Sequence, residues 1–93
     1  MLARTRRPTH PGEILQEEFL TPLGMSQQQL ADQTGYEVKA INRLVNGRTR
    51  LTADMAVALE RVFGSSARFW LNLQIELDLF DAHQKKSVEQ PAA

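Results

Sequence analysis

The hydrophobic positions of this chain recur every three or four residues, as they do along one face of an α-helix. Between residues 27 and 46 this spacing surrounds a glycine: Leu30 and Ala31 precede Gly35, and Ile41 and Leu44 follow it. A small residue where two helices touch, a glycine at the turn and two aliphatic anchors on the second helix are the requirements of a helix-turn-helix. We therefore predict this motif at residues 27–46.

Local start and stop signals place the helices before and within this motif. His10-Pro11-Gly12-Glu13 opens a first helix, because proline suits the first helical position and an acidic residue suits the first turn. We expect that helix to end at Thr21-Pro22, since proline disfavours helix at the residue before it. Ser26 and Gln29 then form a capping box for a second helix, which should stop at Gly35.

Three more helices follow. One spans residues 37–46 and ends at Asn46-Gly47, a pair suited to a left-handed C-terminal turn. Thr52 caps the next helix, and Ser65-Ser66 caps a last one whose apolar positions continue to about Ala82. No segment alternates apolar and polar residues as a half-buried strand would. The pattern predicts an all-α domain of five helices.

The chain divides into three parts. Residues 1–9 show no hydrophobic periodicity and carry Arg4, Arg6 and Arg7, which predicts a flexible basic arm. Residues 10–81 form the helical domain, and 93 residues leave room for only one compact core. Residues 82–93 are polar and include a proline, which predicts a disordered tail.

Composition excludes several classes of protein. No apolar run is long enough to span a membrane, and the arginine-rich start lacks the apolar stretch of a signal peptide. The absence of cysteine excludes a disulfide framework and a thiolate metal site, which fits a cytoplasmic location. The formal net charge is zero, yet residues 36–50 carry four basic residues against one acidic residue. A basic face on a neutral protein can still bind phosphates.

The basic residues cluster on the predicted third helix and on the loop after it. Lys39, Asn42 and Arg43 share a face there and can reach into a DNA major groove. The loop suits phosphates of one strand, as does the N-terminus of the second helix. At each position the alternative is a solvated side chain. The residues predicted to contact DNA are Gln27, Gln28, Val38, Lys39, Asn42, Arg43, Arg48, Thr49 and Arg50.

Two residues at the start of the third helix allow opposite interpretations. Val38 can touch a thymine methyl group or fold back onto the core, and the sequence does not separate the two. Glu37 suits the positive end of a helix dipole, but it would face the DNA polyanion, where it weakens binding or rejects wrong bases. The arginine arm can likewise enter a minor groove or remain a simple basic terminus.

The last helix is apolar on more than one face. Phe69-Trp70, with Leu73 and Leu77 at helical spacing, predicts a core or a dimer interface rather than a ligand platform. The apolar surplus around Leu77, Leu79 and Phe80 indicates burial against a second subunit. We therefore predict a homodimer that uses these three residues.

Several runs of the sequence resemble one family. They are Pro8–Leu15, Glu17–Leu20, Pro22–Gly24, Ile41-Asn42, Asn46–Arg48, Leu51–Ala56 and Phe69–Gln74. Together they cover roughly residues 8–79 and resemble the HigA-type antitoxins of the Xre (Cro/phage-repressor) helix-turn-helix superfamily. The resemblance implies a lambda-repressor-like fold and a homodimer that represses its own operon by binding an inverted repeat in double-stranded DNA. It also implies a partner toxin of the HigB type, a small basic mRNA endonuclease of the RelE class.

Three functions stay open at this point. The first is an antitoxin that is also an autorepressor, the second a stand-alone Xre-type transcriptional regulator without a toxin, and the third a protein-interaction module without useful DNA binding. An enzyme has the least support. His10 and His83 are the only histidines, and no carboxylate pair, metal-ligand spacing or phosphate-binding glycine loop accompanies them. We expect no metal and no cofactor.

Overall fold

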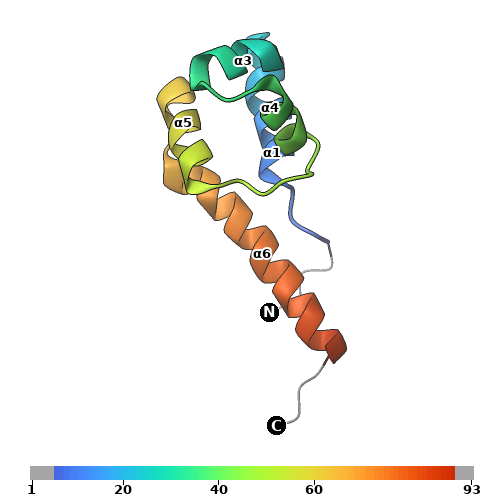
Figure 1. The fold of residues 1–93 in the computed structure, drawn as a ribbon. Helices are drawn as coiled ribbons and strands as arrows, with labels where there is room; N and C mark the ends of the chain where they lie inside the picture. The colour runs from blue at the N-terminus through green and yellow to red at the C-terminus, as the bar shows by residue number, and fades with distance from the viewer. Residues whose placement is uncertain (1–5, 90–93) are drawn as a thin grey trace.

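The computed structural model describes residues 6–89, with side chains as far as Lys85. Its elements, in chain order, are α1 (Pro11–Ile14), η1 (Leu15–Leu20), α2 (Thr21–Leu23), α3 (Gln27–Thr34), α4 (Val38–Val45), α5 (Ala53–Phe63) and α6 (Ala67–Glu89). The first three follow one another without a break, so the described residues contain five helical segments and no strand. The predicted all-α fold is confirmed (Figure 1).

The first helical segment does not end where its proline predicts. It passes through Pro22 and stops at Gly24, whose φ of 65° forms a left-handed cap. The residues before the proline, Leu15–Leu20, form a π-helix, and the Thr21 N–H donates to the carbonyl of Gln16. Pro22 therefore lies at the start of a new turn after this wider one, where its missing N–H costs the helix little hydrogen bonding. The predicted end at Thr21-Pro22 is wrong for this reason.

The helix-turn-helix forms from the local signals in the sequence. Ser26 Oγ accepts from the Gln29 N–H at 3.0 Å, and Gln29 Oε1 accepts from the Ser26 N–H at 2.8 Å, which completes the capping box of α3. Gly35, at a φ of 83°, makes the left-handed turn toward α4. After α4, the N–H groups of Gly47 and Arg48 bond back to carbonyls of the last helical turn. Two short helices therefore occupy residues 27–46, as predicted.

The caps of α5 and α6 are also as predicted. Thr52 Oγ1 accepts from the Met55 N–H at 3.2 Å at the start of α5. Ser66 Oγ accepts from the Phe69 N–H at 3.0 Å at the start of α6. These hydroxyls satisfy backbone donors that the helix itself cannot satisfy.

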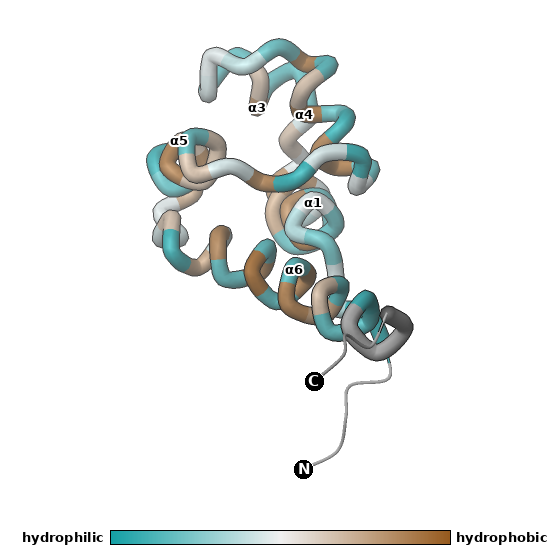
Figure 2. The backbone as a smooth tube through the Cα atoms, turned by 60° about the horizontal axis from the view of Figure 1, so that its bottom comes forward, coloured by the Kyte–Doolittle hydropathy of each residue, from teal (hydrophilic) through white to brown (hydrophobic). Residues whose placement is uncertain are grey.

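The C-terminal end of α6 departs from the prediction. The helix continues to Glu89, so the prediction of a disordered tail is wrong for residues 82–89, whereas residues 90–93 lie outside the described part of the chain. Residues 82–89 are polar but contain no glycine or proline, and alanine, glutamine, lysine and glutamate favour helix. Figure 1 shows the C-terminal turns of α6 extending away from the other helices, and Figure 2 shows hydrophobic and hydrophilic residues mixed along the earlier turns of α6.

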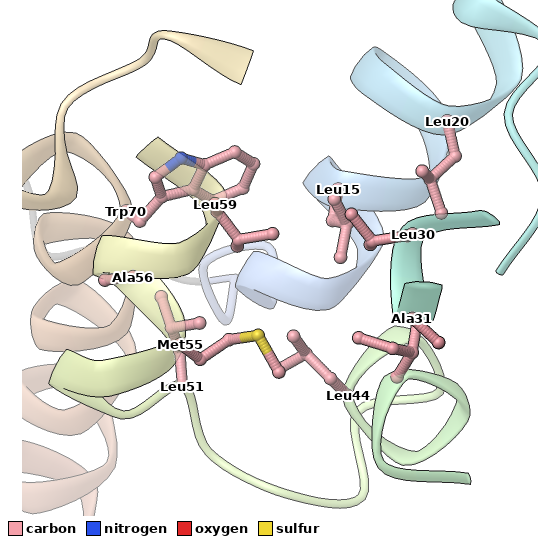
Figure 3. Packing of buried hydrophobic residues seen from close by; sticks show 11 residues of the cluster. Leu15, Leu20, Leu30, Ala31, Leu44, Leu51, Met55, Ala56, Leu59 and Trp70 are labelled. Atoms are coloured by element: carbon pink, nitrogen blue, oxygen red, sulfur yellow. The ribbon is translucent and has the colours of Figure 1, made fainter. Parts of the chain in front are cut away.

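The core lies where the five helical segments meet (Figure 3). Trp70 is completely buried, and its ring centroid lies 4.8 Å from that of Phe19, which in turn lies 5.0 Å from that of Phe63. The segment containing α1 contacts both α4 and α6, whereas α5 packs on α6. The other buried members of the core are Leu15, Leu20, Leu30, Ala31, Ile41, Leu44, Leu51, Met55, Ala56 and Leu59.

Candidate nucleic-acid interface

α4 separates its core residues from its polar residues. Ile41 and Leu44 are buried, whereas Lys39, Asn42 and Arg43 are exposed on the opposite side. The three side chains that we expect to contact DNA therefore lie on one outward ridge of α4. Such a ridge has the size and polarity needed to lie along a major groove.

Val38, at the start of α4, belongs to this exposed surface. Its side chain remains 40% exposed, so it does not fold back onto the core. Glu37 is the N-cap residue of α4, but its side chain makes no capping hydrogen bond. The N-terminus of α4 therefore combines an outward methyl-bearing side chain with an exposed carboxylate.

Gln27 and Asn42 are joined across the helix-turn-helix. Asn42 Nδ2 donates to Gln27 Oε1 at 3.1 Å, and Asn46 Nδ2 donates to Asn42 Oδ1 at 3.2 Å. Gln27 is half-buried as a result of its place between the two helices. The network ties the first residue of α3 to the ridge on α4 and restrains the amide of Asn42. Asn46, which the sequence pattern marked only as the end of a helix, thus joins this network.

Gln28 points along its own helix instead. Its Nε2 donates to Asp32 Oδ1 at 2.9 Å, one turn further along α3. The side chain is exposed but engaged. A phosphate contact by Gln28 would have to replace or share this hydrogen bond.

The loop between α4 and α5 holds the exposed residues Arg48, Thr49 and Arg50. Arg50 forms a bidentate ion pair with Asp78 of α6: Nη1 donates to Oδ1 at 3.0 Å and Nη2 donates to Oδ2 at 2.8 Å. Hydrogen bonds from Arg50 and then from Gln74 hold the pKa of the Asp78 carboxyl below its ordinary value. Arg50 thus lies next to the ridge on α4 while its charge is balanced by α6.

Gln74 anchors this arrangement to the core. It is only 5% exposed, its Oε1 accepts from the Leu51 N–H at 2.8 Å, and its Nε2 donates to Asp78 Oδ1 at 3.0 Å. A buried amide therefore joins the backbone of the loop to the carboxylate that holds Arg50. The spacing of Gln74 and Asp78 along α6 was visible in the sequence, but their partner loop was not.

His10 holds the same loop from the other side. Its Nδ1 accepts from the Gly12 N–H at 2.8 Å, so Nε2 carries the proton and donates to the Thr49 carbonyl at 3.1 Å. Burial is the main cause of a lowered pKa for His10. A Cβ on Gly47 would lie 3.7 Å from the His10 ring, which therefore packs directly against the end of the turn after α4. The sequence identified His10 only as the start of a helix.

Gly12 explains why α1 can lie so close to α4. A Cβ at this position would lie 1.7 Å from the carbonyl oxygen of Leu44 and 3.0 Å from the Cα of Val45. Only glycine permits this approach of the two backbones. His10, Gly12 and Gly47 together form a joint, which we call the His10 joint, that sets where α4 and its loop lie.

Arg7 attaches the described part of the basic arm to α6. Arg7 Nε and Nη2 donate to Asp81 Oδ1 and Oδ2 at 3.1 and 2.9 Å. The hydrogen bond from Arg7 is the main cause of a lowered pKa for Asp81. Arg6 is exposed, and Arg4 lies outside the described residues.

The apolar surface of α6 differs from the predicted dimer interface. Leu77 is only 1% exposed and belongs to the interior, so its assignment to a dimer interface is wrong: the packing of α6 against the domain already buries it. Leu79 is 51% exposed and Phe80 is half-buried. Ile75, one turn before Leu79, is 47% exposed. Phe69 is also partly exposed, whereas its neighbour Trp70 is a core residue.

Other kinds of site receive no support from the described residues. They contain no group of three or more histidine, aspartate or glutamate side chains placed to hold a metal ion. Within residues 6–89, no helix has both the length and the apolarity required to cross a membrane.

The fold and the exposed polar ridge define a DNA-binding protein of the helix-turn-helix class. Residues 16–70 match the model of the helix-turn-helix family. The chain belongs to the Xre helix-turn-helix superfamily, in the group that contains the HigA-type antitoxins. Members of this family are DNA-binding regulators and not enzymes.

Three relatives illustrate the likeness. An uncharacterized HTH-type transcriptional regulator of Haemophilus influenzae is 44% identical over 96% of this chain and 83% of its own length. Antitoxin HigA-1 of Vibrio cholerae is 38% identical over 90% of this chain and 79% of its own length. The solved structure of Pseudomonas aeruginosa antitoxin HigA with the higBA promoter is 40% identical, with a TM-score of 0.84 over 89% of this chain and 90% of that one. The resemblance to HigA-type antitoxins is thus confirmed.

Proposed function

We propose that this protein is the antitoxin of a type II toxin–antitoxin module and the sequence-specific repressor of its own operon in the cytoplasm. The observation that carries the proposal is the outward ridge of Lys39, Asn42 and Arg43 on the second helix of the motif. It is supported by the similar antitoxin from Pseudomonas aeruginosa, which was solved with promoter DNA.

The ridge on α4 can contact bases, and the residues around it can contact phosphates. Lys39 and Arg43 can donate to guanine O6 and N7, and the amide of Asn42 can bond adenine. Val38 can contact a thymine methyl group. The N-terminus of α3 with Gln27 and Gln28, and the loop with Arg48, Thr49 and Arg50, can hold phosphates and so fix the register of the protein on the duplex.

A homodimer would place two such ridges on an inverted repeat. Ile75 and Leu79 are four residues apart on α6, so they share an exposed face, and both are large apolar side chains. A second copy of α6 is the occupant that fits this face, because a two-fold axis brings identical apolar patches together. The symmetric dimer then requires two half-sites about one helical turn apart.

A basic toxin is the proposed protein partner. Exposed carboxylates at Glu13, Glu17 and Glu18 give one side of the first helical segment an acidic surface, which complements a small basic protein. Asp78 and Asp81 of α6, by contrast, already balance arginines of this chain.

The experiment that tests DNA recognition uses the duplex immediately upstream of the protein's own coding sequence. Nuclease protection should cover two half-sites about one turn apart. Arg43→Ala should weaken binding at fixed salt by about 1–3 kcal/mol, because it removes a base-reading side chain. Arg61→Ala removes the same charge from α5 and should leave binding nearly unchanged. Equal affinity of the Arg43 variant and the wild type would contradict the assignment.

A stand-alone transcriptional regulator is the second candidate, favoured by the Haemophilus influenzae relative that is described as a regulator. The two functions differ in the neighbouring gene. Co-expression with an adjacent small basic protein should rescue growth if this chain is an antitoxin. The absence of any toxic neighbouring product, together with operator binding, would favour the regulator.

A further inference from the structure

We propose that Asp78 and Asp81 of α6 are internal competitors of DNA phosphate, which set the affinity for DNA by occupying Arg50 and Arg7. The inference rests on the proposed function, since it concerns how tightly the same interface holds a duplex.

The geometry of both pairs is that of anion recognition. Arg50 meets Asp78 through Nη1 and Nη2, and Arg7 meets Asp81 through Nε and Nη2. Each carboxylate occupies the two parallel donors that a phosphate would use. The carboxylate balances the charge of an arginine paired in this way. Such an arginine cannot neutralise a phosphate, and so cannot release counterions from the DNA, until the pair opens.

Asp78 is held in place by the fold. Gln74, which is 5% exposed, bonds both the Leu51 N–H and Asp78 Oδ1, so a buried side chain positions the carboxylate beside the phosphate-binding loop. Asp81 lies three residues further along the same helix and meets the arm that enters α1. The two pairs, with His10 and Arg48, line one shallow cleft between the loop and α6.

Both pairs are weak enough to open. The side chains of Arg50 and Asp78 are 61% and 40% exposed, and those of Arg7 and Asp81 are 54% and 50% exposed. Exposed ion pairs contribute little to stability because water and salt screen them. A duplex, with its dense line of phosphates, can displace such a carboxylate, at a cost in affinity.

The test measures binding of the full chain to a mixed-sequence DNA duplex by fluorescence anisotropy across a range of salt concentrations. Phosphate contacts do not depend on sequence, so this probe reports them directly. Asp78→Asn keeps an oxygen that accepts from Gln74 but removes the negative charge that pairs with Arg50. Asp81→Asn removes the negative charge that pairs with Arg7. Each variant should bind about two- to fivefold more tightly than the wild type. The plot of log affinity against log salt should steepen by about 0.9 for each arginine released.

Two controls separate this effect from a general change of charge. Glu60→Gln makes the same change in net charge on α5 without touching Arg7 or Arg50, and should bind like the wild type. In an Arg50→Gln background, Asp78→Asn should leave the affinity for DNA unchanged, because the arginine that it would free is absent. Thermal melting of each variant verifies that the fold is kept.

Several results would overturn the inference, and each has a different meaning. If the wild type binds the duplex but Asp78→Asn binds equally or more weakly, the carboxylate positions Arg50 instead of withholding it. A gain that persists without Arg50, or that Glu60→Gln reproduces, would show a general effect of charge, and the inference would fail. If the wild type binds no duplex even at low salt, both this inference and the proposed DNA binding fail.

Discussion

Replacing Gly12 with alanine tests how α1 supports α4. Gly12 is buried in α1, directly against the backbone of α4. The added Cβ would lie 1.7 Å from the Leu44 carbonyl oxygen and 2.6 Å from its carbon. Both atoms belong to the backbone, so no rotamer change relieves the contact, and the two helices must separate by more than an ångström.

The loss of stability can be estimated from the overpacking that the added methyl group causes. Overpacking of a tight interior costs roughly 1–3 kcal/mol, and a rigid backbone partner places Gly12→Ala at the upper end. Alanine recovers at most about 1 kcal/mol through its better helix propensity. The free energy of unfolding should therefore fall by about 2 kcal/mol, which lowers Tm by roughly 8–16 °C for a domain of this size.

The assay is thermal unfolding followed by circular dichroism, with Gly24→Ala as the matched control. Gly24 has a φ of 65° and no atom within 4 Å of an added Cβ, so its alanine variant meets backbone strain but no clash. It should cost about 1 kcal/mol and leave DNA binding intact. Gly12→Ala should also weaken binding to DNA below its melting temperature, because α4 is displaced.

A Gly12→Ala variant that melts within about 3 °C of the wild type would contradict this prediction, because a loss of about 1 kcal/mol lowers Tm by more than that in a domain of this size. Greater destabilisation by Gly24→Ala than by Gly12→Ala would contradict it as well. Either result would mean that α1 and α4 can separate without loss, so that the His10 joint does not set the position of α4.

Two further predictions concern groups next to this joint and at the start of α4. The pKa of His10 is lowered by burial, so the unfolded chain binds the proton more readily, and stability should fall as the pH drops from about 7.5 to about 5.5. Melting curves of His10→Gln, which does not titrate, should vary less over this interval, and an equal slope in both proteins would refute the assignment. Glu37→Ser should raise the free energy of unfolding by about 1 kcal/mol by supplying the missing N-cap of α4. It should also tighten DNA binding by removing a carboxylate beside the ridge, and weaker binding in a titration would show that Glu37 reads a base.

The sequence predicted the helices best where local chemistry decides the structure. The capping box at Ser26 and the hydroxyl cap at Thr52 involve atoms three residues apart, so the pattern alone is sufficient. The prediction failed at Pro22, because a π-helix before the proline has no simple sequence signal. It also failed for residues 82–89, because a polar segment without glycine or proline can extend a helix as readily as it can be disordered.

The candidate site was predictable only in part, for a related reason. Helical periodicity places Lys39, Asn42 and Arg43 opposite Ile41 and Leu44, and the structure has this arrangement. Periodicity does not show which elements meet in space. The pairing of Arg50 with Asp78, and the burial of Leu77 within its own chain, therefore required the fold.

The division of α4 into two sides has a consequence for how such proteins change. Ile41 and Leu44 are buried on its inner side and Val45 packs partly against the core, whereas positions 38, 39, 42 and 43 are exposed. If these positions contact DNA as proposed, new side chains there should change the DNA sequence that is bound and leave the melting temperature nearly unchanged. Within the eight residues of α4, the positions that stabilise the fold are therefore different from the positions that evolution or protein design can vary.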